Sequence, residues 1–141
     1  MNKPLAGVRV LDLTHMLSGP YAGMILADLG AETIKVEPLQ GEGTRTLLAT
    51  DPDNSLGGMG AYFLTLNRNK KSVAIDLKSA RGMELFQGLV EKADIVLSNF
   101  AAGVPERLGL DFATLCRVNP RIITCTVTGY GAQGPGANRP A

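Results

Sequence analysis

Polar and aromatic side chains follow each predicted strand, where a parallel sheet brings its loops together. His15 to Ser18 follow the first strand and Pro38 follows the second, while Lys78, Asn99-Phe100 and Tyr130 follow the next three. Loops after successive parallel strands lie at one edge of the sheet, so we expect these residues to converge. A lysine there suits a phosphate group, and Phe100 can stack on a flat ring.

The passage from the first strand into a helix is the most distinctive local feature. The apolar run Val8 to Leu13 gives way to the loop Thr14 to Leu17, and Ser18-Gly19-Pro20 then opens a helix. A helix start presents unpaired N–H groups and a partial positive charge, which suit an anionic ligand. A plain tight turn in which Ser18 only caps the helix explains the same residues, and the local pattern leaves both interpretations open.

The other candidates also have structural explanations. His15 has no carboxylate partner close in sequence, which favours a structural or backbone-orienting role over that of a general base. The run Arg68 to Lys71 can supply charge to phosphates but is more typical of a solvated turn. Taken alone, Phe100 is typical of a core residue and Lys78 of a solvent-facing one.

Alternating strand and helix patterns predict an α/β fold with a Rossmann-like open, mostly parallel sheet and helices on both faces. We expect strands at 8–13, 32–36, 72–77, 94–98 and 121–127. We expect helices from Gly19 or Pro20 to Leu29, from a Ser79 cap to about Lys92, as a short turn from Pro105, and from an Asp111 cap to about Val118. Residues 62–66 fit either a short helix or a strand.

The chain of 141 residues is predicted to form one domain, residues 1–141. The long loop at about 39–60 is interpreted as a mobile cover beside a site, with disorder as an equal alternative. The glycine-rich end follows a predicted buried strand at the edge where such sheets carry chemistry. We therefore expect the chain to be the N-terminal part of a longer one; a disordered natural tail is the alternative.

Composition and motifs argue against several function classes. A formal net charge of +1, with no basic stripe, disfavours nucleic-acid binding. No Gly-x-Gly-x-x-Gly follows the first predicted strand, and the sequence has no phosphate loop and no Gly-x-Ser-x-Gly turn. His15 is the single histidine, so no metal site is predicted.

The same composition bears on the compartment. The chain is 45% hydrophobic and 19% charged, without a membrane-spanning run or a secretory signal, so we expect a soluble cytoplasmic protein. Cys116 and Cys125 lack metal-ligand spacing and are expected to be buried thiols.

Taken together in order, the motifs resemble the family III coenzyme A (CoA) transferases (CaiB/BaiF family), and the likeness extends to the related α-methylacyl-CoA racemases. The resemblance covers essentially the whole chain. It rests on Pro4 to His15, Ser18-Gly19-Pro20, Leu29 to Pro38, Asn67 to Ser72, Ala93 to Val96 with Asn99-Phe100, and Thr128 to Gly131 with Gly134-Pro135.

The resemblance implies an enzyme that moves CoA between carboxylic acids through an aspartyl-CoA thioester. Its substrates would be an acyl-CoA and a carboxylic acid, with no covalently bound cofactor, and the full-length protein would form an interlaced homodimer. The family's nucleophilic aspartate would lie beyond Ala141. None of the aspartates at 12, 28, 76, 94 and 111 matches its position, so this segment by itself is expected to be inactive.

The resemblance also implies where CoA contacts this chain. His15, Met16, Leu17 and Ser18 would line the pantetheine and acyl end. Ile75 to Lys78, with Asn99, Phe100 and Ala101, would line the adenosine and pantetheine region. Arg107 and Arg139 would contact phosphates. Pro38 stands where some members have an arginine, so that contact with CoA would differ here.

Two alternatives to a transferase stay open. An α-methylacyl-CoA racemase would use a His/Asp acid–base pair, and both residues would lie at or past the end of this chain. A non-catalytic module that binds CoA or a nucleotide, or that binds another protein, is the alternative from a different class.

Overall fold

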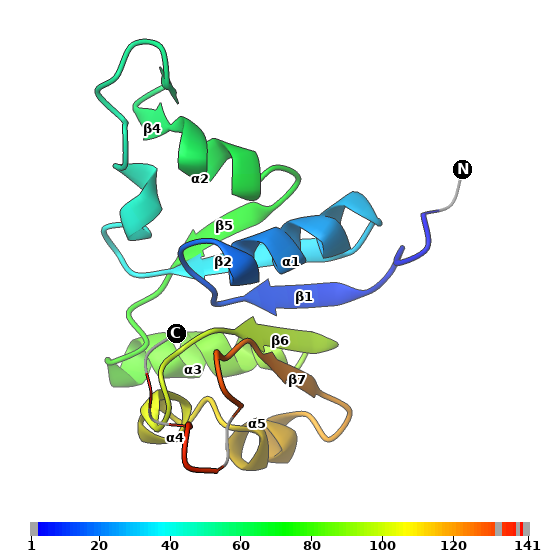
Figure 1. Cartoon of the computed structure of the whole chain (residues 1–141). Helices are drawn as coiled ribbons and strands as arrows, with labels where there is room; N and C mark the ends of the chain where they lie inside the picture. The colour runs from blue at the N-terminus through cyan, green and yellow to red at the C-terminus, as the bar shows by residue number, and fades with distance from the viewer. Residues whose placement is uncertain (1–2, 132–133, 138, 140–141) are drawn as a thin grey trace.

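A five-stranded parallel sheet forms the centre of the protein, with strand order β5-β2-β1-β6-β7 (Figure 1). The computed structural model describes residues 3–131, 134–137 and 139. The chain moves outward from β1 to β5 and then returns to start again at β6, so the order reverses between β1 and β6. This confirms the predicted Rossmann-like sheet. The strands are β1 (Arg9–Asp12), β2 (Glu32–Glu37), β5 (Lys71–Ala74), β6 (Ile95–Ser98) and β7 (Ile123–Thr126).

Helices cover both faces of the sheet, as predicted. On one face, Val10 and Leu97 pack against Ala22 and Leu26 of α1. On the other face, the sheet packs against α3 and α5. Residues 62–66, which fit either a helix or a strand, lie in a helix. The helices are α1 (Ser18–Asp28), α2 (Ala61–Leu66), α3 (Ala80–Val90), α4 (Val104–Leu108) and α5 (Phe112–Val118).

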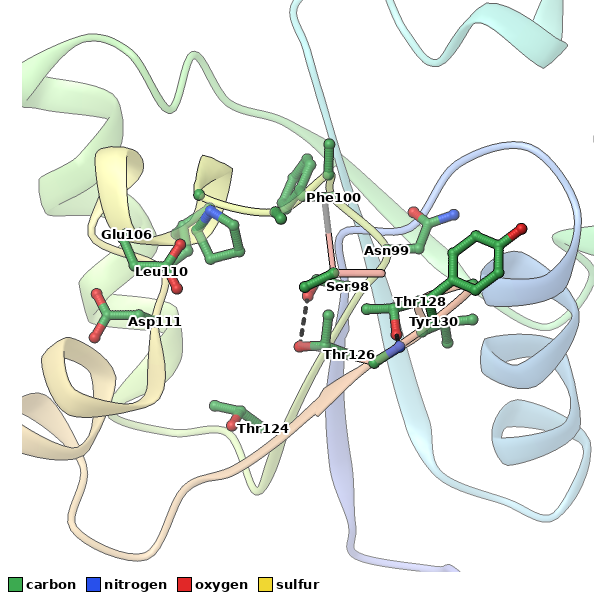
Figure 2. A pocket seen from close by; sticks show the side chains of 18 of the residues that line it. Ser98, Asn99, Phe100, Glu106, Leu110, Asp111, Thr124, Thr126, Thr128 and Tyr130 are labelled. Atoms are coloured by element: carbon green, nitrogen blue, oxygen red, sulfur yellow. Dashed lines mark hydrogen bonds between the residues drawn. The ribbon is translucent and has the colours of Figure 1, made fainter. Parts of the chain in front are cut away.

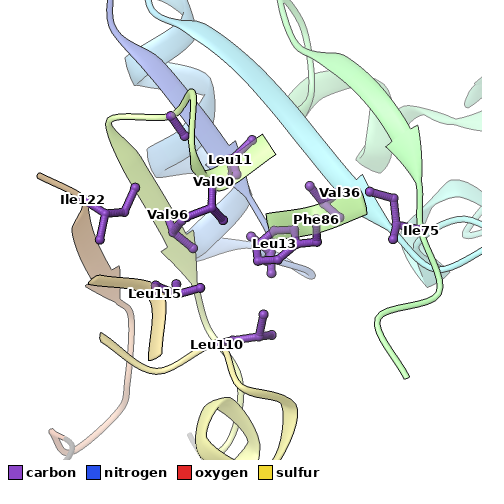
Figure 3. Close-up of a cluster of buried hydrophobic side chains, with 11 residues drawn as sticks. Leu11, Leu13, Val36, Ile75, Phe86, Val90, Val96, Leu110, Leu115 and Ile122 are labelled. Atoms are coloured by element: carbon purple, nitrogen blue, oxygen red, sulfur yellow. The ribbon is translucent and has the colours of Figure 1, made fainter. Parts of the chain in front are cut away.

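The larger hydrophobic core lies between the sheet and the α3–α5 layer (Figure 3). Leu11 of β1, Phe86 and Val90 of α3, and Leu115 of α5 are completely buried there. Burial of each such side chain contributes about 1.5–3 kcal/mol. This core holds β1 and β6 at the centre of the sheet and so fixes the origin of the loops that follow them.

Both predicted helix caps, Ser79 and Asp111, are confirmed. The Ser79 hydroxyl accepts from the Gly82 N–H at the start of α3, and the Asp111 carboxylate accepts from the Thr114 N–H at the start of α5. Helix α1 instead begins at Ser18, with Leu17 as its N-cap residue. The capping role considered for Ser18 is therefore wrong, because this residue already lies in the first turn.

The segment 39–60 contains short regular elements. A 3-10 turn, η1 (Gly43–Arg45), is followed by a hairpin of β3 (Ser55–Leu56) and β4 (Met59–Gly60). Gly57 and Gly58 have φ angles of +59° and +75°, which suits the two-residue turn of a hairpin. These elements give the segment local regular structure, and its interpretation as a mobile cover beside a site, with disorder as the alternative, stays a prediction.

The expectation that both cysteines are buried is wrong. Cys125 is exposed and Cys116 is half-buried. Cys125 lies in β7, an edge strand, opposite Leu97 in the ladder, and its neighbour Ile123 is 59% exposed. The part of the chain that the structure describes does not cover this face of β7. An apolar strand pattern therefore did not show that Cys125 is buried.

The basic run before β5 also differs from the expected solvated turn. Arg68 and Lys71 do lie at the surface, where they pair with Asp28 and Glu32. The side chain of Lys70, however, is 1% exposed, and its ammonium lies 2.8 Å from a carboxylate oxygen of Asp12. Lys70 is therefore an internal ion-pair partner of β1 and neither a phosphate ligand nor a solvated charge.

Helix α1 leaves room for this buried pair through a glycine. A β-carbon at Gly23 would lie 2.5 Å from Oδ2 of Asp12 and 3.3 Å from the Lys70 ammonium. The Lys70 ammonium also donates to the carbonyl of Pro20 and to the side chain of Asn67, both at 2.8 Å. The pair thereby ties β1, α1 and the turn before β5 together.

We expect Gly23→Ala to lower the free energy of unfolding by about 3 kcal/mol, because it forces the buried pair apart and leaves a charge without its partner. Urea denaturation at neutral pH measures this change. Gly88→Ala is the matched control: an added β-carbon at Gly88 in α3 meets open space, and alanine should stabilise that helix by up to about 1 kcal/mol. Equal stability of Gly23→Ala and the unmodified protein would contradict this account of the pair.

Candidate functional site

Two cavities lie side by side at the carboxyl edge of the sheet. The larger, about 940 Å³, is bounded by the loops after β1, β6 and β7 and by α4 and the start of α5. The smaller, about 580 Å³, is bounded by the ends of β1 and β2 and by the loop after β5. His15, Met16 and Phe100 line both cavities and form their shared wall. The site thus lies where the strand order reverses, the usual place for ligands in open α/β sheets.

The larger cavity has a polar floor (Figure 2). The hydroxyls of Ser98 and Thr126, from neighbouring strands β6 and β7, lie 3.5 Å apart there. Figure 2 shows the carboxylates of Glu106 and Asp111 on one side of these hydroxyls and Tyr130 on the other. Hydrogen bonds from Thr114 lower the pKa of Asp111, which favours its charged form.

The structure brings together most of the residues proposed from the sequence. The loops after the five parallel strands meet at one edge, as predicted. The larger cavity is lined by His15, Met16, Leu17, Ser18, Asn99, Phe100, Ala101 and Arg139. The smaller one adds Pro38, Ile75 and Lys78.

Arg107 is placed differently from the other candidates. It lies in α4 with its guanidinium beside Gly103, and it is not among the described residues that line the two cavities. Its contact with a phosphate stays a prediction.

Side chains from other elements bind the backbone N–H and carbonyl groups of the loop after β1, from Thr14 to Met16. The Asn99 amide bridges His15 in both directions: it accepts from the His15 N–H at 3.0 Å and donates to the His15 carbonyl at 2.8 Å. Glu42 accepts from the Met16 N–H at 3.0 Å, and Lys35 donates to the Thr14 carbonyl at 2.8 Å. The shared wall of the two cavities is therefore preorganised.

The side chain of His15 packs against an aromatic ring. The centroids of His15 and Phe100 are 5.7 Å apart, with the ring planes inclined by 50°. Phe100 in turn packs on the edge of the larger hydrophobic core. This contact and the bridge to Asn99 support the backbone-orienting interpretation of His15, and they also explain how Phe100 can be part core and part cavity wall.

A buried carboxylate anchors the far side of the smaller cavity. Glu37, at the end of β2, is 3% exposed and accepts two hydrogen bonds of 2.7 Å from the Arg45 guanidinium. It also accepts from the Ser72 hydroxyl and the Glu42 N–H. Burial alone would raise the pKa of Glu37, but these donors outweigh it and lower the pKa to about 2. Arg45 lies 4.0 Å above the Phe63 ring, so the carboxylate links β2 to α2.

Sequence reasoning missed the charged residues that support this site. Lys35 and Glu42 are 1% and 7% exposed and lie 3.4 Å apart, beside the Asp12–Lys70 pair. Asp12 and Lys35 each interrupt an apolar strand pattern, and that interruption was the available signal. Among the described residues, no group of three or more His, Cys, Asp and Glu side chains could hold a metal ion, and no helix is long and apolar enough to cross a membrane.

Comparison with known proteins decides the family. The sequence profile of CoA-transferase family III matches residues 5–141. The chain belongs to CoA-transferase family III. Mouse succinyl-CoA:glutarate CoA-transferase is 43% identical over 138 residues, which cover 97% of this chain and 31% of the relative. Acetyl-CoA:oxalate CoA-transferase of Acetobacter aceti is 43% identical over 139 residues, covering 98% and 34%.

A solved structure from the same family has the same fold. The crystal structure of a CaiB/BaiF family protein from Brucella suis superposes with a TM-score of 0.90 and 41% identity, and the match covers 99% of this chain and 37% of that one. The chain thus spans about a third of the length of the family III relatives it matches.

We expect Glu37→Gln to lower the free energy of unfolding by about 2 kcal/mol at pH 7, because the neutral amide loses the charge-assisted bonds to Arg45. The folded pKa of Glu37 lies below its ordinary value of 4.5, so its contribution is complete above pH 4.5 and disappears as the pH falls through about 2. Urea denaturation from pH 7 to pH 2 should show the two proteins converging at low pH.

The control for this series is Glu84→Gln. Glu84 is exposed and pairs with Arg81 one helical turn away, so the change should stay within about 0.5 kcal/mol. A stability difference for Glu37→Gln that does not shrink at low pH would argue against an ionised Glu37 as the anchor.

Proposed function

We propose that this chain supplies the CoA-binding surface of a CoA-transferase. The observation that carries the proposal is the pair of cavities joined by the wall of His15, Met16 and Phe100. CoA is long, with an anionic phosphorylated end and a thiol at the other end, so it needs two connected subsites. The exposed amine of Lys78 in the smaller cavity suits a phosphate group, and the first turn of α1 in the larger cavity suits a polar acyl end.

The range of relatives supports the assignment of CoA to this part of the protein. The glutarate and oxalate transferases act on different acids, as their names state, yet both are 43% identical to this chain. CoA is the substrate component that both names share. Because this chain is equally similar to the two transferases, we infer that it binds CoA rather than selects the acid.

In the proposed reaction, a carboxylate of the enzyme attacks the carbonyl carbon of an acyl-CoA and expels the CoA thiolate, which leaves a mixed anhydride. The thiolate then attacks the enzyme's own acyl carbon, forming an aspartyl-CoA thioester and releasing the donor acid as its carboxylate. An acceptor carboxylate reverses these two steps and leaves as the new acyl-CoA. The residues of this chain hold CoA in place through both exchanges, so that the thiolate stays next to the anhydride.

We place the nucleophilic aspartate outside this chain. Asp12 is paired with Lys70, Asp28 with Arg68, and Asp94 accepts from the Arg9 N–H. Asp76 and Asp111 line the cavities, but the first accepts from the Lys78 N–H and the second from Thr114. These hydrogen bonds stabilise the charged carboxylates and make them poorer nucleophiles. An interlaced homodimer in the cytoplasm completes the proposal for the whole enzyme.

Isothermal titration of the 141-residue chain with CoA tests the binding assignment. We expect one saturable site, and we expect Lys78→Ala to weaken binding by about tenfold because a charge-assisted contact is lost. Lys92→Ala is the matched control, since Lys92 is also exposed but follows α3 at the opposite edge of the sheet. Absence of heat with CoA would refute the proposal, and equal binding of ATP and CoA would favour a nucleotide-binding module.

A trapping experiment tests the placement of the nucleophile. The chain is incubated with succinyl-CoA, glutarate and hydroxylamine, and its mass is then measured. We expect no covalent adduct on any aspartate, whereas the mouse succinyl-CoA:glutarate CoA-transferase should form a hydroxamate under the same conditions. A hydroxamate on an aspartate of this chain would show that the nucleophile lies within it.

A further inference from the structure

The loop between β1 and α1 owes its shape to side chains from other parts of the protein. Five consecutive polar backbone groups, from the Thr14 N–H to the Met16 N–H, each bond to a side chain. Asp12 comes from β1, Lys35 from β2 and Asn99 from the loop after β6. The fourth side chain, Glu42, comes from the segment after β2. It binds the Met16 N–H, the last of these five groups before α1 begins.

Met16 is the strained point of this loop. Its φ angle is +68°, in the left-handed region that is unfavourable for a residue other than glycine. Such a conformation persists only where the surroundings fix it. Its N–H donates to Oε1 of Glu42 at 3.0 Å, and the residue is 56% exposed, so this hydrogen bond rather than side-chain packing holds the strained backbone.

The Glu42 carboxylate is itself locked in place. Its second oxygen accepts from the Thr44 hydroxyl at 2.7 Å and lies 3.4 Å from the Lys35 ammonium. Its backbone N–H donates to the Glu37 carboxylate at 2.9 Å. With 7% of its surface exposed, Glu42 has little freedom to move, and it transmits the position of the segment 39–45 to Met16.

The geometry points to Glu42 as a positioning residue for the CoA site, an inference that rests on the proposed function. Glu42 holds Met16 and so directs Leu17 and Ser18, the residues that open α1, into the larger cavity. Without it, Met16 relaxes to a negative φ and the wall between the two cavities moves. Binding of a ligand that spans both cavities then becomes weaker, because the ligand must restore the strained loop.

Variants at position 42 test this role through the affinity for CoA. We expect Glu42→Ala to raise the Kd for CoA about tenfold in isothermal titration. Glu42→Gln keeps an amide oxygen for the Met16 N–H and should stay within about threefold of the unmodified chain. Val90→Ala is the control for stability alone: Val90, the last residue of α3, is fully buried in the larger hydrophobic core, so its truncation should destabilise the fold and leave the Kd unchanged.

Hydrogen exchange at the Met16 amide supplies a readout independent of CoA. We expect this amide to exchange at least about tenfold faster in Glu42→Ala than in the unmodified chain, and to stay protected in Glu42→Gln. Slow exchange in Glu42→Ala, or an unchanged Kd in that variant, would overturn the positioning role while the proposed function stands. Failure of the unmodified chain to bind CoA would instead refute the proposed function, and the exchange result would still decide whether Glu42 fixes the loop.

Discussion

Buried charges at the carboxyl ends of β1 and β2 are the constraint on which the rest of the structure depends. Removing an ion from water costs several kcal/mol, so each of these charges needs a partner inside the protein. Asp12 obtains Lys70 from the turn before β5, and Lys35 obtains Glu42 from the segment after β2. Burial lowers the pKa of Lys70, while the nearby carboxylate of Asp12 opposes that shift and favours the ammonium form. Two loops are thereby forced to fold back on the sheet.

The same pairs join the stability of the fold to the shape of the site. Asp12 bonds Lys70 with one oxygen and the Thr14 N–H with the other, so the residue that anchors the turn before β5 also starts the loop after β1. Small residues make the approach of α1 possible: a β-carbon at Gly19 would overlap the side chain of Thr14, just as one at Gly23 would meet Asp12. A change in this region therefore alters the fold and the cavity wall together. Preorganisation of the site is a consequence of how the chain neutralises its internal charges.

The sequence alone was sufficient for the fold but not for this network. Strand and helix patterns are local, so the five strands, the Ser79 and Asp111 caps and the common edge of the loops could be predicted. Pairing of Asp12 with Lys70 joins residues that are 58 positions apart, and no local pattern encodes such a distance. The prediction that Cys125 is buried was wrong for a related reason. The exposure of Cys125 depends on what covers an edge strand, whereas the apolar pattern of β7 indicates only that these residues form a strand.

Internal neutralisation also determines which charges can act on a ligand. The buried ammonium groups of Lys35 and Lys70 are balanced by carboxylates a few ångströms away, so they add little field at the cavities. Positive charge for an anionic ligand must then come from exposed side chains such as Lys78 and Arg139 and from the start of α1. Exposed charges attract ligands over a range that salt shortens. The buried charges set the shape of the site, and the exposed ones would attract the phosphate groups of the CoA that we propose it binds.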